Sequence, residues 1–137
     1  MTTRPSLVLR IGDRPCCLDA RLVSEVLRPR PLAPFDAAGP AVLGAAIIRG
    51  EPTPVIDAAA ALGLPPSAEP AARWVVARPG RRPLALAVAA VIGVRPMDLD
   101  QDSAWTLDAD ASVGFLAWNS DVLLLLRSLR IFEAACP

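Results

Sequence analysis

The chain has 137 residues, a formal net charge of zero and no histidine. This length suits one domain or two small packed lobes, and the neutral charge gives no general argument for binding nucleic acid or an acidic membrane. The absence of histidine removes the usual general base and the commonest metal ligand. The composition therefore disfavours an enzyme, and we expect no catalytic residue, no metal and no cofactor.

Cysteine spacing and hydropathy indicate the compartment. Cys16, Cys17 and Cys136 have neither the spacing of zinc ligands nor that of a disulfide framework, which favours reduced thiols in the cytoplasm. Residues 1–15 carry charges that a secretory signal lacks. The longest apolar run, residues 84–94, is about half of the roughly 20 residues that a membrane-spanning helix needs. We expect a soluble, cytoplasmic protein without membrane insertion.

The first third of the chain predicts a hairpin and a short helical turn. Residues 6–11 alternate in polarity, Gly12-Asp13 is a turn pair, and residues 15–19 form the returning strand. Asp19 is suited to cap a helical turn that runs into extended chain within residues 20–27. Residues 28–40 are rich in proline, which predicts an ordered loop.

The stretch 42–65 contains the highest density of residues whose type and position predict local structure. Two apolar runs, residues 42–48 and 55–56, are separated by a polar corner at residues 49–51. Asp57 is suited to cap the alanine-rich turn that follows, and Gly63 to end it. We expect Ile47 in the core, so that Ile47→Asp would collapse this part of the fold.

The remaining residues predict further short strands. Residues 65–72 form a loop and the one plausible seam between lobes. The apolar runs at 84–88 and 91–94 suggest strands buried on both faces, and residues 97–110 an acidic surface loop. Further signals predict a strand at 73–78, a last hairpin at 113–126, and a closing helix at 128–135 that turns Leu129 and Phe132 inward. About eight to ten short strands with little helix indicate an all-β fold, as small barrels or a sandwich.

One ordered set of motifs resembles a known family. Residues 44–57 read glycine, apolar residues, Arg49-Gly50, two spacers and then Pro-Val-Ile-Asp. This resembles the central motif of the CheW-like domain, and Val23-Ser24-Glu25-Val26 is similar to an upstream segment of that family. The resemblance covers nearly the whole chain in the right order. It implies a single domain, residues 1–137, made of two intimately packed five-stranded SH3-like β-barrels with short helical turns.

The resemblance also implies a function. CheW-like proteins are non-catalytic adaptors that bridge chemoreceptors and the histidine kinase CheA. They bind the regulatory domain of the kinase through one surface and the cytoplasmic hairpin tip of the receptor through another. Carried over to this chain, the partner-binding residues are Arg49, Glu25, Gly50, Gly44 and Val23. Arg49 would shape the surface by pairing with Glu25, the glycines would meet backbone requirements, and the apolar Val23 also suits a core position.

Departures from the family pattern keep two other functions open. Ala89 and Arg127 stand where the family often has a polar or acidic residue, Cys16-Cys17 where an aromatic residue is common, and Ala58-Ala59 where Leu and Arg usually follow Asp57. One alternative is a degenerate CheW-like protein that binds only other CheW-like domains. The other is an unrelated small all-β ligand-binding module.

Overall fold

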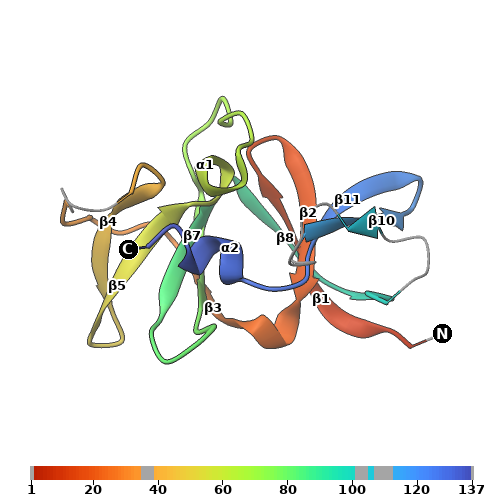
Figure 1. The fold of residues 1–137 in the computed structure, drawn as a ribbon, viewed down its shortest axis with the longest axis horizontal. Coiled ribbons are helices and arrows are strands. Elements are labelled where there is room, and N and C mark those ends of the chain that lie inside the picture. Colours follow the sequence, from red (N-terminus) through yellow and green to blue (C-terminus); the bar gives the residue numbers. More distant parts are fainter. Residues whose placement is uncertain (1, 35–38, 101–104, 107–112, 137) are drawn as a thin grey trace.

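The computed structural model describes residues 2–34, 39–100, 105–106 and 113–136. This part of the chain is mainly β, as the sequence predicted, and its helical segments are short (Figure 1). They are η1 (Ala20–Leu22), α1 (Ala58–Leu62) and α2 (Arg130–Glu133). Asp57 caps α1 by accepting a hydrogen bond from the Ala60 N–H at 3.3 Å, and Gly63 ends it with a left-handed φ of 70°. Both predictions are confirmed.

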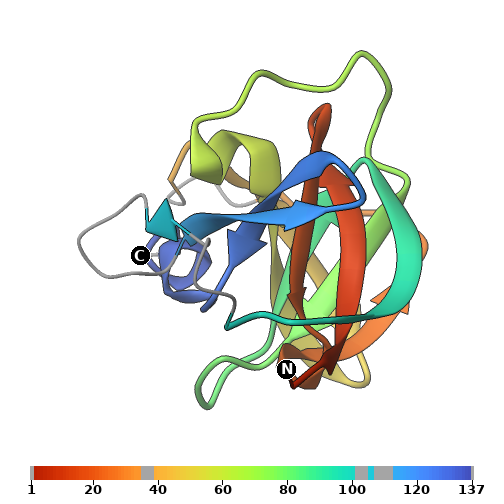
Figure 2. The same cartoon turned by 90° about the vertical axis from the view of Figure 1, so that its right-hand side faces the viewer.

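The strands form two sheets, which lie side by side in Figure 1, and Figure 2 views the molecule from the side of the six-stranded sheet. The six-stranded sheet has the order β8-β1-β2-β11-β10-β9, with β1 (Arg4–Ile11), β2 (Arg14–Asp19), β8 (Ala90–Met97), β9 (Trp105–Thr106), β10 (Val113–Trp118) and β11 (Asp121–Leu126). The five-stranded sheet has the order β3-β6-β7-β5-β4, with β3 (Val23–Leu27), β4 (Val42–Ile48), β5 (Glu51–Asp57), β6 (Arg73–Ala77) and β7 (Leu84–Val88). The predicted fold is confirmed, with one added strand because the two-residue β9 pairs with β10.

The chain crosses between the sheets at two short connections. One is η1, which follows β2 and leads into β3, and the other is Ala89 between β7 and β8. The Ala89 N–H donates to the Arg10 carbonyl of β1 at 2.9 Å, which holds this crossing against the six-stranded sheet. The loop at residues 65–72 joins α1 to β6, and its flanking strands belong to one sheet. The domain division, including a seam at that loop, stays a prediction.

The largest hydrophobic core is shared by both sheets. Alternate residues of β1, β2 and β11 meet alternate residues of β6 and β7 there, and Leu129 and Phe132 of the α2 segment complete it. The other faces of these strands line two smaller cores, one private to each sheet. Such strands are buried on both faces, which is why they read as nearly continuous apolar runs. The prediction of two-faced burial is confirmed for β7, whose five residues are all buried.

Two sequence predictions about burial are wrong. Strand β8 is an edge strand, and Ile92 and Val94 are exposed although their apolar run suggested burial on both faces. Ile47 is 61% exposed rather than part of the core. The register of β4 shifts between Val42 and Gly44, and the neighbouring Ile48 takes the buried position. Periodicity shows which residues share a face of a strand. It does not show whether other elements of the fold pack against the second face.

The predicted acidic loop at 97–110 falls largely outside the described residues, which omit 101–104 and 107–112. Within the described part, Met97 still belongs to β8, Leu99 is buried, and residues 105–106 form β9. This part of the segment is therefore more structured than the sequence suggested.

The burial difference between two neighbouring isoleucines is testable. Ile48→Asp places an unpaired charge beside buried side chains and should lower the free energy of unfolding by about 3–5 kcal/mol. Ile47→Asp adds the same charge to an exposed position and should change it by less than about 1 kcal/mol. Urea denaturation followed by circular dichroism measures both. Equal losses in the two variants would contradict the assigned register of β4.

Candidate partner-binding surface

The corner between β4 and β5 is a two-residue turn. Ile48 pairs with Glu51, and the intervening Arg49 and Gly50 have φ angles of 50° and 78°. Positive φ at both central positions is typical of the type I′ turn, whose twist matches that of the flanking strands. Glycine adopts this conformation freely, whereas for a residue with a side chain its conformational energy is higher by roughly 1 kcal/mol. The turn therefore holds Arg49 in one backbone conformation and projects its side chain from the end of the hairpin.

Arg49 pairs with Glu25 of β3, as the resemblance implied. Its Nε lies 2.8 Å and its Nη2 2.5 Å from Glu25 Oε2. The Arg49 side chain is 79% exposed, while that of Glu25 is only 17% exposed. The hydrogen bond from Arg49, with its positive charge, holds the pKa of Glu25 below its ordinary value. The pair therefore joins an exposed guanidinium to a carboxylate on a mostly covered side chain.

This ion pair connects the two edges of the five-stranded sheet. Strands β3 and β4 are its outermost strands, so the Arg49–Glu25 contact spans the gap that remains when the sheet curls into a barrel. Backbone hydrogen bonds close the same gap further along: Ala33 and Ala45 exchange two of them, at 2.8 and 2.9 Å. Arg30 adds a bond to the Ile47 carbonyl at 3.3 Å. The candidate surface thus closes the barrel formed by the five-stranded sheet, which we call the first barrel.

The other candidate residues support this closure from different positions. Gly44 has a φ of 153°, and a Cβ there would lie 2.5 Å from the Ala33 carbonyl oxygen, so glycine permits the close approach of the closing segment. Gly50 also has a positive φ, but nothing lies within 4 Å of an added Cβ. Val23 packs partly buried against the shared core, at the start of β3. The structure brings Arg49, Glu25 and Gly50 together, whereas Gly44 and Val23 serve the backbone and the core.

Sequence reasoning missed a set of four exposed apolar side chains on the segments that close this barrel. We call it the closure strip; it comprises Val26, Leu32, Leu43 and Ile47. Leu43 and Ile47 are on the edge strand β4, and the other two belong to β3 and the segment after it. Exposed apolar residues that gather into a patch mark binding surfaces, and an edge strand also presents unpaired backbone groups to a partner. The alternation within β4 was a signal, but the bulge near Gly44 concealed which residues face outward.

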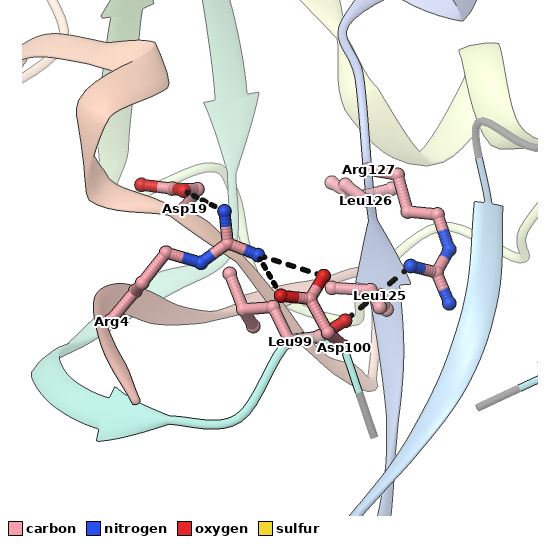
Figure 3. A pocket seen from close by; sticks show the side chains of 7 residues that line it. All are labelled: Arg4, Asp19, Leu99, Asp100, Leu125, Leu126 and Arg127. Carbon is pink, nitrogen blue, oxygen red and sulfur yellow. Dashed lines mark hydrogen bonds and ion pairs between the residues drawn. The ribbon is translucent and has the colours of Figure 1, made fainter. Parts of the chain in front are cut away.

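A small pocket lies in the six-stranded half, near the start of β1 (Figure 3). Arg4 spans it, with Nη1 3.4 Å from Asp19 Oδ2 and Nη2 3.0 Å from Asp100 Oδ1. Arg127 reaches the Leu99 carbonyl from the other side at 3.4 Å. The volume is about 170 Å³, below the roughly 300–1,000 Å³ usual for small-molecule sites, and the guanidinium of Arg4 is already engaged. This pocket gives little support to a ligand-binding module.

The cysteines take structural positions. Cys16 faces the shared core and Cys17 the core private to the six-stranded sheet, and burial raises the pKa of each thiol to about 12. A thiol with such a pKa is protonated and unreactive at neutral pH. Among the described residues, no group of three Cys, Asp or Glu side chains is placed to hold a metal ion. In the same part of the chain, every helix is too short or too polar to span a membrane.

Comparison with known proteins identifies the family. The model of the CheW-like domain matches residues 5–136. The chain belongs to the CheW-like domain family. As a CheW-like domain it shares its fold with the scaffolding protein TtCheW of Thermoanaerobacter tengcongensis, with a TM-score of 0.81 and 19% identity over 96% of this chain and 94% of the other.

Curated relatives support the assignment. The chemotaxis protein CheW of Rhizobium meliloti is 34% identical over 73 residues, and the probable chemotaxis protein CheW of Rhizobium etli is 37% identical over the same length. Each alignment covers 53% of this CheW-like domain and 46% of the relative. The matched region thus spans about half the length of these relatives.

Gly44 in β4 and Gly50 in the corner should respond differently to substitution. In Gly50→Ala the added Cβ lies in open space, so only the positive φ matters. The variant should lower the free energy of unfolding by roughly 1 kcal/mol. Gly44→Ala adds a clash with the Ala33 carbonyl and should cost about 2 kcal/mol or more, because the closing segment must move away from β4. Urea denaturation of both variants gives the comparison. A larger loss for Gly50→Ala would contradict the close approach at Gly44.

The ion pair should be visible in the titration of Glu25. Its lowered pKa means that the pair stabilises the fold above the ordinary pKa of glutamate, about 4.3, and that this contribution disappears as pH falls through the lowered value. In the Arg49→Ala variant, the NMR titration midpoint of Glu25 should rise toward the ordinary value. Asp19, whose pKa is lowered mainly by its hydrogen bond from Arg21, is the control and should keep its midpoint. An unchanged Glu25 midpoint would exclude the pair in solution.

Proposed function

We propose that this CheW-like domain is a non-catalytic, cytoplasmic adaptor that couples chemoreceptors to a CheA-type histidine kinase. One observation carries the proposal: the Arg49–Glu25 ion pair closes the first barrel directly beside exposed apolar side chains. Surfaces that bind proteins commonly have an apolar centre and a polar rim. The corner and the closure strip together have this composition. We assign them to binding the regulatory domain of the kinase, and another surface to the receptor hairpin tip.

The residues divide by role in this proposal. Arg49 belongs to the rim of the binding surface, and Glu25 fixes its side chain in place. Gly50 allows the turn that presents Arg49, while Gly44 lets the closing segment approach β4. Val23 acts indirectly, because it anchors the start of β3 in the shared core and thereby positions Glu25. The relatives named above are chemotaxis or scaffolding proteins by name, which agrees with an adaptor role.

Removing the Arg49 side chain tests the assignment. Arg49→Ala should weaken binding to the purified regulatory domain of the kinase by about tenfold, which corresponds to about 1.4 kcal/mol. The melting temperature should change little, because an exposed ion pair contributes little to stability. Isothermal titration calorimetry measures the affinity.

The matched control is Arg14→Ala, another exposed arginine in a hairpin of the other sheet, which should bind as the unchanged protein does. A large drop in melting temperature for Arg49→Ala would make this residue structural. If the unchanged protein binds neither the regulatory domain nor the receptor hairpin tip at tens of micromolar, the proposed function is wrong.

A further inference from the structure

A group of arginines surrounds the corner of the first barrel. We call it the basic rim; it comprises Arg30, Arg49, Arg78, Arg81 and Arg82, all exposed. Contacts connect its members across three segments. Arg30 reaches the Ile47 carbonyl of β4, Arg49 pairs with Glu25, and Arg78 pairs with Glu51 at 2.7 Å. Arg78 also donates to the carbonyl of Arg81 within the β6–β7 turn. These contacts place Arg30, Arg49 and Arg78 around the corner, and Arg81 and Arg82 follow Arg78 in the β6–β7 turn.

The basic rim is not neutralised by its neighbours. Among the described residues, the carboxylates linked to it are those of Glu25, Glu51 and Glu133, the last lying beside Gly80 of the β6–β7 turn. Five arginines against three carboxylates leave a positive excess, in a chain whose formal net charge is zero. Glu25 and Glu51 are already engaged with Arg49 and Arg78. Within the described part of the chain, no carboxylate lies within ion-pair distance of Arg30, Arg81 or Arg82.

The basic rim adjoins the closure strip. Arg30 joins the two directly, because its guanidinium binds the carbonyl of Ile47, a residue of the strip. The strip contains no aromatic side chain, and the nearest tryptophan on β6, Trp74, is buried. Single-stranded nucleic acids need exposed aromatic residues on which bases stack, so this surface is unsuited to them. An apolar strip with a basic border instead fits a protein face of opposite charge.

We propose that the kinase regulatory domain docks here through a face with an apolar centre and a net acidic border. This inference rests on the proposed function and adds the chemistry of the partner. The apolar centre would cover the closure strip, and acidic side chains of the partner would meet Arg30, Arg81 and Arg82. Charge complementarity of this kind raises the rate of association and rejects partners with a basic border. The charge on this surface therefore selects which regulatory domain the adaptor engages.

The salt dependence of association tests the inference. We expect the association rate constant for the purified regulatory domain to fall about tenfold between about 0.05 and 0.5 M NaCl, because screening shortens the range of the attraction. The double variant Arg81→Gln/Arg82→Gln should associate several-fold more slowly at low salt and lose much of this dependence. Its dissociation rate constant should change less. Surface plasmon resonance or stopped-flow fluorescence measures both rate constants.

A matched control removes the same charge elsewhere. Arg10 and Arg14 are exposed residues of the β1–β2 hairpin, whose turn lies at the opposite end of the molecule from the β6–β7 turn in both Figure 1 and Figure 2. Arg10→Gln/Arg14→Gln should retain the rate and the salt dependence of the unchanged protein. The substituted side chains are exposed in both double variants, and a thermal melt of each should show that the fold is kept.

Four outcomes would overturn the inference. Tight binding that is independent of salt and of Arg81 and Arg82 would leave the proposed function intact and refute the acidic border. Equal effects of the two double variants would show a non-specific charge effect. Binding of the basic rim to vesicles of anionic phospholipid, lost in Arg81→Gln/Arg82→Gln while regulatory-domain binding is unaffected, would assign it to a membrane surface. Absence of any binding to the regulatory domain or the receptor hairpin refutes the proposed function and this inference with it.

Discussion

The shared hydrophobic core is the constraint on which this structure depends. Five strands, β1, β2, β6, β7 and β11, contribute alternate side chains to it and bury their other faces in the private cores. Most side chains of these strands are therefore committed to packing, and polar side chains lie mainly at edges and turns. The edge strands β3, β4 and β8 carry exposed apolar residues, because each has a neighbouring strand of its sheet on one side only. A protein built in this way exposes its sheet edges and its turns.

Closing the first barrel gives one of these edges a defined shape. The Ala33–Ala45 backbone bonds and the Arg49–Glu25 ion pair join β4 to the segment that starts in β3. The close approach depends on the absence of a side chain at Gly44, and the projection of Arg49 depends on the two-residue turn. Because Arg49 is largely exposed, the pair adds more to geometry than to stability. Its function in our proposal is to hold a binding surface in one conformation before the partner arrives, which lowers the entropic cost of association.

The charge around that edge agrees with an assembly of modest, selective contacts. In our proposal the basic rim supplies long-range attraction, and the closure strip supplies apolar area once the partner is docked. Adaptors that act in arrays gain affinity from many simultaneous contacts, so each interface need not be tight. Selectivity then matters more than strength, and opposite charge at the border of an interface provides it without adding buried ion pairs.

The sequence by itself determined much of this protein. Its two-residue turns, its caps at Asp19 and Asp57, and its short apolar runs follow from local rules, and the order of motifs around Arg49-Gly50 was enough to identify the family. The Arg49–Glu25 contact was expected from the resemblance, since the residues are 24 positions apart and no local pattern connects them. Only the tertiary structure decided that Ile47, Ile92 and Val94 are exposed, that η1 and Ala89 carry the chain between the sheets, and that arginines from three segments form one basic rim. Periodicity records the two faces of a strand, but which of them another strand covers depends on sheet order and register, and these are set by contacts between distant parts of the chain.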